Sequence, residues 1–193
     1  MNILVKQHKE EVFEMAITRK QIATAKAQET YKNHFDINEV RQFGDYETNL
    51  TKLVDDLELT VVNVDIREMF KDNDLVDKTT SGFLLKTNEE HMVVINKNQN
   101  LRRKRFTLAH EIGHYLLGHL SDVEFGLTCR NSKSAEGIDI EEIEANTFAA
   151  ELLVPEELIR EWHKANKSPR FLAEIFNVSE SVINYRLKNL ELI

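Results

Sequence analysis

The pattern His110-Glu111-Ile112-Gly113-His114 combines two side chains that bind metal ions with one that can move a proton. Residues four apart on an α-helix point in nearly the same direction, so His110 and His114 can both direct a ring nitrogen at one zinc ion. Glu111 lies beside them, where its carboxylate can accept a proton from a water activated by zinc. The pattern therefore predicts zinc-dependent hydrolysis of a peptide bond, with Glu111 as the catalytic base.

The sequence around this pattern indicates that the polar side chains face an internal cleft. Most neighbours at helical spacing are apolar, namely Phe106, Leu108, Ala109, Ile112, Leu116, Leu117 and Leu120. Unpartnered polar groups in an apolar setting are costly, and a bound metal removes that cost. Gly113 lowers helix propensity but lets a neighbouring backbone approach closely. Both observations favour a metal site over an accidental match.

A catalytic zinc ion needs a third protein ligand and one open position. His119 follows His114 by five residues, and on a continuous helix it points away from both other histidines. We therefore interpret His119 as a helix-end residue, where a histidine suits the helix dipole.

The segment from 140 to 154 offers better candidates for the third ligand. Glu142 shares its helical face with small residues that let two helices lie close, Ala145, Asn146 and Ala149. Glu144 shares its face with Thr147, Phe148 and Glu151. We therefore expect Glu142 to be the ligand, with Glu144 as the alternative. Asn146, one turn after Glu142, can accept the other ring proton of a ligating histidine.

Further elements must position these groups. Residues 1 to about 57 have helical spacing of apolar residues and predict two or three helices, with breaks at Asp36 or Gly44. Residues 57–97 contain β-branched runs and a hairpin turn, which predict a small antiparallel sheet of about three strands.

The remaining segments predict mostly helix. Asn98 or Asn100 can cap the helix that carries the histidines, which we expect to run to about Leu120. A second long helix is expected to end at Pro155 and to be followed by a short one. Residues 168–193 are typical of two helices joined by a turn, like a helix-turn-helix.

These elements together predict an α+β fold. A helix-rich domain carries the small antiparallel sheet packed on its metal-binding helix. We divide the chain into an N-terminal helical region (1–55), a metallopeptidase core (56–163) and a C-terminal helix-turn-helix-like element (164–193) packed on the core.

Composition excludes several classes of protein. The 193 residues are 41% hydrophobic and 30% charged, which is too apolar for general disorder, and only 6 Gly and 2 Pro argue against an all-β fold. Apolar runs stop at four residues, whereas a membrane span needs about 20. The single cysteine, Cys129, forms no internal disulfide, so we expect a cytoplasmic protein. The net charge of -8 disfavours nucleic acid as the main partner.

Two motif blocks, residues 105–117 and 142–155, resemble the ImmA/IrrE family of zinc metallopeptidases. The resemblance covers about residues 55 to 193, and the first 55 residues resemble nothing we can name. It implies a zincin-like metallopeptidase domain and a gluzincin-like zinc site with His110, His114 and Glu142 as ligands, Glu111 as base and Asn146 as a helper. It also implies a protein substrate, since members of the family cleave or relieve helix-turn-helix repressors, and others pair with such regulators in toxin–antitoxin-like modules.

Two other functions remain open. The protein can be a non-catalytic anti-repressor that only binds a repressor, or a DNA-binding regulator that uses polar residues of its last helix, Asn184, Tyr185, Arg186 and Lys188. The basic run from Arg102 to Arg105 fits either a solvated helix start or a surface for an acidic substrate. Tyr115, His163 and Tyr46 are nominal oxyanion donors, none of them assigned. The predicted strand 91–96 fits either an ordinary hairpin or an edge that pairs with an extended substrate.

Overall fold

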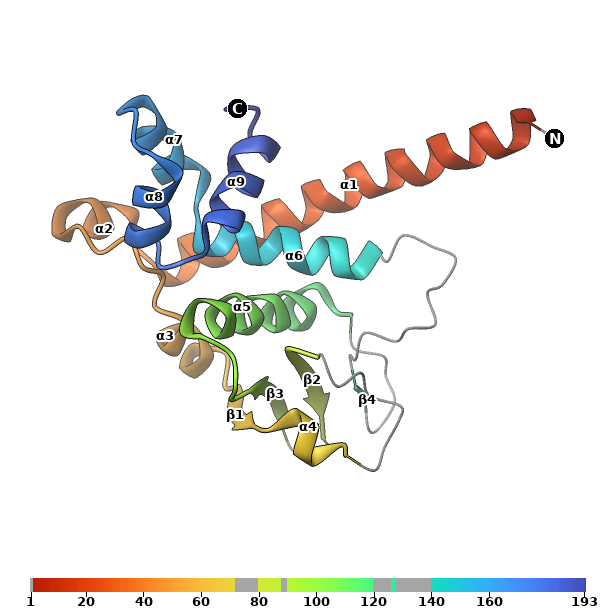
Figure 1. The fold of residues 1–193 in the computed structure, drawn as a ribbon, viewed down its shortest axis with the longest axis horizontal. Coiled ribbons are helices and arrows are strands. Elements are labelled where there is room, and N and C mark those ends of the chain that lie inside the picture. The colour runs from red at the N-terminus through yellow and green to blue at the C-terminus, as the bar shows by residue number, and fades with distance from the viewer. Residues whose placement is uncertain (1, 72–79, 88–89, 120–125, 128–139) are drawn as a thin grey trace.

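A computed structural model describes residues 2–71, 80–87, 90–119, 126–127 and 140–193, so Cys129 lies outside the described residues. It shows the expected helix-rich α+β architecture (Figure 1). The helices are α1 (Asn2–His34), α2 (Ile37–Phe43), α3 (Leu50–Asp56), α4 (Ile66–Met69), α5 (Leu101–Leu117), α6 (Ile140–Leu153), α7 (Glu156–Lys164), α8 (Pro169–Ile175) and α9 (Glu180–Asn189). The strands are β1 (Thr60–Val64), β2 (Gly82–Lys86), β3 (His91–Asn96) and β4 (Gly126–Leu127).

The N-terminal helices break where the sequence predicts. Asp36 caps α2, its Oδ1 accepting a hydrogen bond from the Asn38 backbone N–H at 2.8 Å. Gly44 ends α2 in the left-handed conformation, with φ of 72°, where glycine carries no Cβ penalty. Asp36 acts through its side chain and Gly44 through its backbone conformation, and both effects are confined to a few residues, so these breaks could be predicted from the sequence.

The prediction of an antiparallel sheet is wrong in one pairing. The strand order is β1-β3-β2-β4, and β2 is antiparallel to both β3 and β4, but β1 runs parallel to β3. The short turn between β2 and β3 forces an antiparallel hairpin. The longer connection from β1 to β2 contains α4 and allows β1 to cross to the far side of β3. The sheet is therefore mixed.

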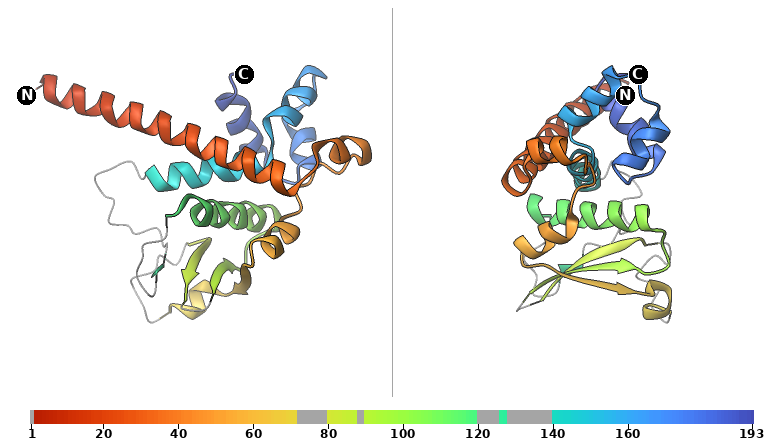
Figure 2. Two further views of the ribbon diagram at one scale, coloured as in Figure 1. Left: turned by 180° about the vertical axis from the view of Figure 1, so that it is seen from behind. Right: turned by 90° about the vertical axis from the view of Figure 1, so that its left-hand side faces the viewer.

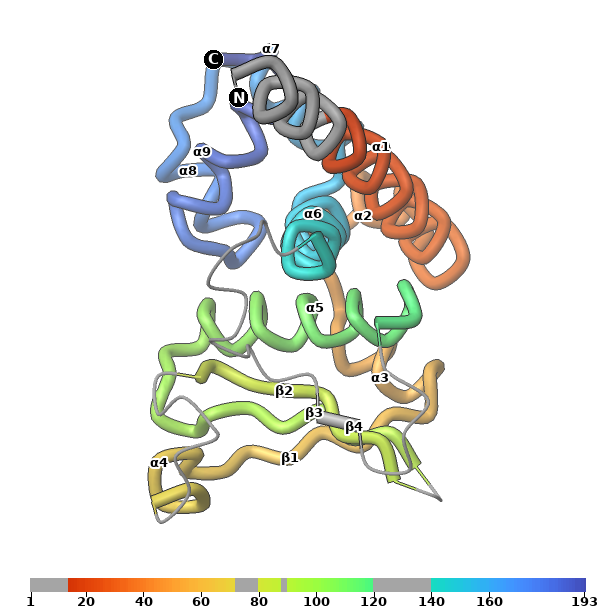
Figure 3. The backbone as a smooth tube through the Cα atoms, turned by 90° about the vertical axis from the view of Figure 1, so that its right-hand side faces the viewer, coloured from red at the N-terminus to blue at the C-terminus, as the bar shows by residue number. Residues whose placement is uncertain are grey.

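The metal helix α5 lies between the sheet and α6. In Figure 2 the sheet forms one layer, α5 crosses over it, and the remaining long helices form the layer beyond. Along the view of Figure 3, α6 lies between α1 on one side and α8 and α9 on the other. Helices α5 and α6 therefore meet in the middle of the molecule, where both are packed on several sides.

Alternating residues of the central strands serve two clusters of buried side chains. Leu84, Val93 and Ile95 belong to the main core together with Ile112 of α5. Phe83 and Val94 face the other way and pack with Ile66 of α4. This period-two alternation fixes the register of the sheet beneath the metal helix.

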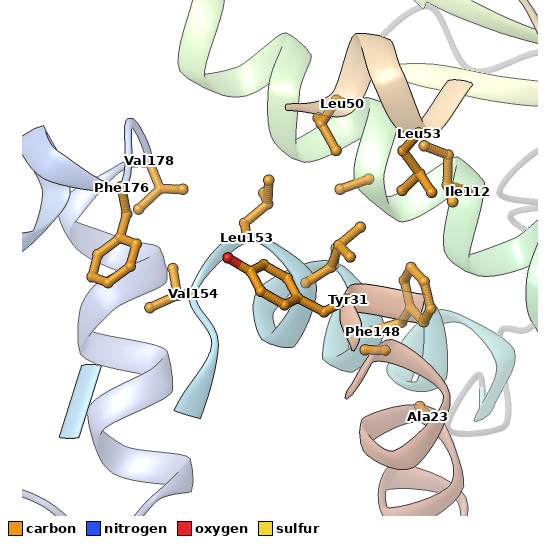
Figure 4. Close-up of a cluster of buried hydrophobic side chains, with 14 of the residues drawn as sticks. Ala23, Tyr31, Leu50, Leu53, Ile112, Phe148, Leu153, Val154, Phe176 and Val178 are labelled. Atoms are coloured by element: carbon orange, nitrogen blue, oxygen red, sulfur yellow. The ribbon is translucent and has the colours of Figure 1, made fainter. Parts of the chain in front are cut away.

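The main core joins the N-terminal helices to the rest of the chain. Figure 4 shows Ala23 and Tyr31 of α1 and Leu53 of α3 converging with Ile112 of α5 and Phe148 of α6. Ala23, Leu53, Ile112 and Phe148 are all 0% exposed. Because burial of apolar surface is the main favourable term in folding, this shared cluster holds α5 and α6 together.

The metal helix is fixed at both ends. Asn100 caps it, accepting a hydrogen bond from the Arg103 N–H at 2.9 Å, and Gly118 ends it with φ of 74°. The helix therefore ends at Leu117, earlier than the predicted Leu120, because Gly118 adopts the left-handed C-cap conformation.

The basic run at the start of α5 contacts three neighbouring segments. Arg102 Nη2 lies 2.6 Å from Glu174 Oε2, and Arg103 Nη2 lies 2.9 Å from Ser81 Oγ. Arg105 pairs with Glu47 at 2.6 Å. These contacts tie the start of the metal helix to α8, to the beginning of β2 and to the segment before α3.

The last helices, α8 and α9, pack against each other and α9 also contacts α6. Arg186 of α9 is 3% exposed and donates to Glu151 Oε2 at 2.6 Å and to the Val154 carbonyl at 3.1 Å. Arg186 is thus buried and anchors α9. The DNA-binding alternative needs this side chain to be exposed. Among the described helices, none has both the length and the apolar character that crossing a membrane requires.

Candidate metal centre

His110 and His114 occupy successive turns of α5 and point into the interior. They are 8% and 4% exposed, and their Nε2 atoms lie 3.1 Å apart. At this separation the two ring nitrogens can both bind one ion. The spacing of four residues therefore produces the convergence that the sequence predicts.

Gly113 is the point at which α6 approaches α5 most tightly. A Cβ atom on Gly113 would lie 3.0 Å from Phe148 Cδ1 and 3.3 Å from both the Cα and the carbonyl oxygen of Ala145. These separations leave no free room for a methyl group. The glycine thus lets α6 lie against the face of α5 that carries the histidines, as the sequence predicts.

Glu142, on the first turn of α6, is the carboxylate beside both imidazoles. Its Oε1 lies 3.4 Å from His114 Nε2 and its Oε2 lies 3.6 Å from His110 Nε2. Burial opposes ionisation of Glu142, but hydrogen bonds and positive charge from the two histidines outweigh it and hold the pKa of this carboxyl well below its ordinary value. Glu142 is therefore a carboxylate, the form that binds a cation.

The three side chains fit a metal ion by donor type and by distance. Their ligand atoms all lie within 4.8 Å of one another, and the closest approaches are the 3.1, 3.4 and 3.6 Å given above. Tetrahedral zinc with bonds of about 2.1 Å separates its ligand atoms by about 3.4 Å. Among the residues that the structure describes, these three are the histidine, cysteine and acidic side chains whose ligand atoms come close enough together to hold a metal ion.

Glu111 follows His110 on α5 and is 4% exposed. It lies outside the converging group of three. Glu111 therefore follows a donor in the sequence without being one of the three donors.

Asn146 contacts neither imidazole, although the sequence predicted that it would accept a ring proton from one of them. His110 Nδ1 is buried without a hydrogen-bond partner among the described residues, and His114 Nδ1 faces His119 instead. Asn146 lines a groove of about 1170 Å³ with Phe106 of α5 and Tyr185 of α9. Asn146 lies one helical turn after Glu142 on α6, towards the start of α5 and away from the rings. No contact therefore supports its predicted role as a helper of a histidine ligand.

Sequence reasoning missed a chain of contacts behind His114. His119 Nδ1 lies 2.9 Å from His114 Nδ1, and His119 Nε2 lies 3.0 Å from Glu144 Oε2. Arg19 Nη1 of α1 lies 3.5 Å from the other oxygen of Glu144. Burial, and after it repulsion from His114, lowers the pKa of His119, so this ring is neutral near pH 7.

The residues that the sequence offered as oxyanion donors take part in aromatic packing or have no contact that supports that role. Tyr46 packs edge-on against Trp162 and Phe176, with ring centroids 5.3 and 6.0 Å apart. Tyr115 lies against His91, with centroids 5.0 Å apart. His163 lies on α7, whose Trp162 packs against Phe171 of α8 with ring centroids 5.5 Å apart. Strand 91–96 is central, paired on both sides, so it offers no free edge for a substrate.

Comparisons with known proteins show which family the chain resembles. Residues 63–188 match the family model of the IrrE N-terminal-like domain, Peptidase_M78. The chain is 30% identical to the metallopeptidase ImmA of Bacillus subtilis over 112 residues, which cover 57% of this chain. It is 34% identical to the radiation response metalloprotease IrrE of Deinococcus radiodurans over 94 residues, 48% of this chain, and 29% identical to immunity region protein 2 of Bacillus phage phi105 over 109 residues, 51% of this chain.

The matched regions span two thirds or less of these relatives, 64% of ImmA, 28% of IrrE and 66% of the phage protein. Among solved structures, a Mycobacterium tuberculosis transcriptional regulator is similar with a TM-score of 0.52 and 17% identity. That similarity covers 92% of this chain and 51% of the other. At this identity it shows a shared fold and nothing more.

Proposed function

The chain belongs to the ImmA/IrrE family, whose domain model covers residues 63–188, and from this premise we propose that it is a zinc-dependent endopeptidase. The observation that carries the proposal is the convergence of His110, His114 and Glu142 at separations of 3.1 to 3.6 Å. Two imidazoles and one carboxylate leave one position of a tetrahedral ion open, which is the ligand set of catalytic zinc sites. Metallopeptidase names among the relatives support the same conclusion.

Glu111 is the catalytic base in this proposal. A bound zinc ion would supply Lewis acidity, polarising the peptide carbonyl and making water more acidic. Glu111 accepts a proton from the attacking water and passes it to the nitrogen of the leaving amine. Its burial at 4% exposure excludes bulk water from this transfer. His110, His114 and Glu142 stay in place throughout and keep the site in one geometry.

The substrate is a protein, and we place it among helix-turn-helix transcriptional repressors. The family resemblance supports this class, as does the name of the phage relative, which refers to an immunity region. The groove lined by Phe106, Asn146 and Tyr185 begins one turn away from His110 and Glu142 and is large enough for an extended polypeptide. We also propose a division of the chain into a catalytic core (56–163), an N-terminal region (1–55) and a helix-turn-helix-like element (164–193). The single cysteine is consistent with our expectation of a cytoplasmic protein.

Zinc content and cleavage of a candidate repressor test the proposal. We expect about one zinc per wild-type chain and almost none in Glu142→Ala, because two histidines alone hold the ion weakly. Incubation with the repressor encoded beside this protein's gene should give defined fragments, abolished by a chelator and restored by zinc.

Glu111→Gln is the matched control, since it keeps the three donors and removes only the base. It should bind zinc normally and leave the repressor intact. If Glu111→Gln still relieved repression in cells, the non-catalytic anti-repressor would replace the enzyme as the conclusion. A wild-type protein that binds no zinc when zinc is supplied would remove the hydrolase altogether.

A further inference from the structure

A line of contacts runs from His114 through the buried side chains of His119 and Glu144 to the half-exposed Arg19 of α1. The distances are 2.9 Å between the Nδ1 atoms of His114 and His119 and 3.0 Å from His119 Nε2 to Glu144 Oε2. We propose that His119 and Glu144 are positioning residues that fix the orientation and tautomer of His114 for metal binding, and that α1 supports them through Arg19. This inference rests on the metal site of the proposed function.

The contacts have one consistent set of hydrogen-bond directions. A metal ion on His114 Nε2 requires the proton of that neutral ring to be on Nδ1. His114 Nδ1–H then donates to His119 Nδ1, which leaves the proton of His119 on Nε2. His119 Nε2–H donates to the Glu144 carboxylate, which only accepts. Each link therefore selects the tautomer that binds metal.

Burial makes these contacts effective. The side chains of His119 and Glu144 are 6% and 2% exposed, so water competes little for their hydrogen bonds. Leaving a buried polar group without its partner is costly. The His114 ring is therefore confined to the orientation that satisfies His119.

The backbone turn at Gly118 creates this arrangement. With φ of 74°, Gly118 turns the chain back, and the His119 N–H bonds to the His114 carbonyl at 3.0 Å. The two rings then meet edge to face with centroids 4.9 Å apart. His119 thus returns to His114 by leaving the helix.

The support is unequal between the two histidines. His110 Nδ1 has no hydrogen-bond partner among the described residues, whereas His114 has the whole line behind it. Helix α1 lies outside residues 63–188, so Arg19, 3.5 Å from Glu144 Oε1, adds a contact from a part of the chain that the family model does not cover.

Metal affinity and the absorption spectrum of the cobalt-substituted protein test the inference. Zinc affinity is measured in competition with a chromogenic chelator, and cobalt bands report ligand geometry. His119→Ala and Glu144→Gln should weaken zinc binding by about 10- to 100-fold, the usual effect of removing a partner of a metal ligand, and should shift the cobalt bands. His119→Asn should recover part of the affinity, because its amide oxygen can accept the proton from His114 Nδ1.

Matched controls separate positioning from stability. Glu151→Gln removes an equally buried carboxylate from α6 at a point that pairs with Arg186, so it should lower stability without shifting the cobalt bands. Arg19→Met should weaken zinc binding by no more than about fivefold, because Arg19 is half exposed. Lys20→Met removes the neighbouring charge without touching Glu144 and should have no effect.

The outcomes are distinguishable from those of the proposed function. Unchanged zinc affinity and cobalt bands in folded His119→Ala and Glu144→Gln, with zinc lost in Glu142→Ala, overturn this inference and leave the metal site intact. Equal effects of Arg19→Met and Lys20→Met overturn the contribution of α1. A wild-type protein without zinc affinity overturns both proposals.

Discussion

At the scale of single residues, Gly113 sets how closely the third donor can approach. Between the two histidines, it leaves Ala145 and Phe148 of α6 within 3.3 Å of the point where a Cβ atom would lie. Glu142 lies one turn before Asn146 on the same helix, so any shift of α6 away from α5 moves the carboxylate away from the imidazoles. Packing at a residue without donor atoms therefore controls the geometry of the donors.

We expect Gly113→Ala to lower both stability and zinc affinity. Overpacking costs about 1–3 kcal/mol, which exceeds the gain of about 1 kcal/mol in helix propensity, so the free energy of unfolding should fall by about 1 kcal/mol. Urea unfolding of the apoprotein and zinc competition measure the two effects.

Gly44→Ala, at the end of α2, is the matched control for that substitution. A Cβ on Gly44 meets nothing within 4 Å, and its positive φ alone causes strain, which costs about 1–2 kcal/mol. The two variants should therefore lose similar stability, with the larger loss of zinc affinity in Gly113→Ala. Wild-type zinc affinity in Gly113→Ala would contradict this account of the close approach.

At the scale of elements, α9 is held by the buried ion pair of Arg186 and Glu151. Glu151 also accepts from the Glu156 N–H at 3.1 Å, so a single carboxylate connects α6, the start of α7 and α9. Burial raises the pKa of Glu151 while Arg186 lowers it, and the pair is stable only when both partners are present. The C-terminal element is thus fastened to the helix that carries Glu142.

Arg186→Ala should reduce the free energy of unfolding by about 3–5 kcal/mol, because it leaves a buried carboxylate without its cation. Chemical unfolding followed by circular dichroism measures the loss. Lys188→Ala, an exposed cation on the same helix, should change stability by less than about 0.5 kcal/mol. If both variants unfolded alike, the anchoring role of Arg186 would be wrong.

At the scale of the whole molecule, α1 is part of the main core although it precedes the matched family region. Ala23 and Ala27 are 0% exposed and Tyr31 is 6% exposed, all within the cluster that includes Phe148 of α6. Small residues at these positions let α1 lie along α6, on the side opposite α9 (Figure 3). The metal helix and its partner are therefore stabilised by a helix that the family resemblance does not include.

Ala23→Asp should lower the free energy of unfolding by about 3 kcal/mol or more, since it buries an uncompensated charge. The adjacent Ile22 is 49% exposed, so Ile22→Asp is the control and should cost less than about 1 kcal/mol. Thermal unfolding of the two variants makes the comparison. Similar midpoints would show that α1 contributes little to the core.

Local signals in the sequence predicted most elements and the donors of the site. Caps act within a few residues, so Asp36 and Gly44 could be named from the sequence, and the cap of α5 could be narrowed to Asn98 or Asn100, of which the structure shows Asn100. The spacing of His110 and His114 and the small face around Glu142 follow from helical periodicity, which is independent of the rest of the fold. Catalysis by Glu111 and the choice of zinc stay predictions.

The tertiary structure alone decided the features that depend on long-range contacts. The parallel pairing of β1 with β3 depends on a crossover that the strand sequences do not encode. Burial of Arg186 depends on Glu151, 35 residues away, and the missing contact of Asn146 depends on how α6 lies across α5. His119 reaches His114 because α5 ends at Gly118 and because Glu144 on α6 pairs with the far side of the His119 ring. Sequence periodicity describes the faces of one helix, whereas packing between helices decides what each face meets.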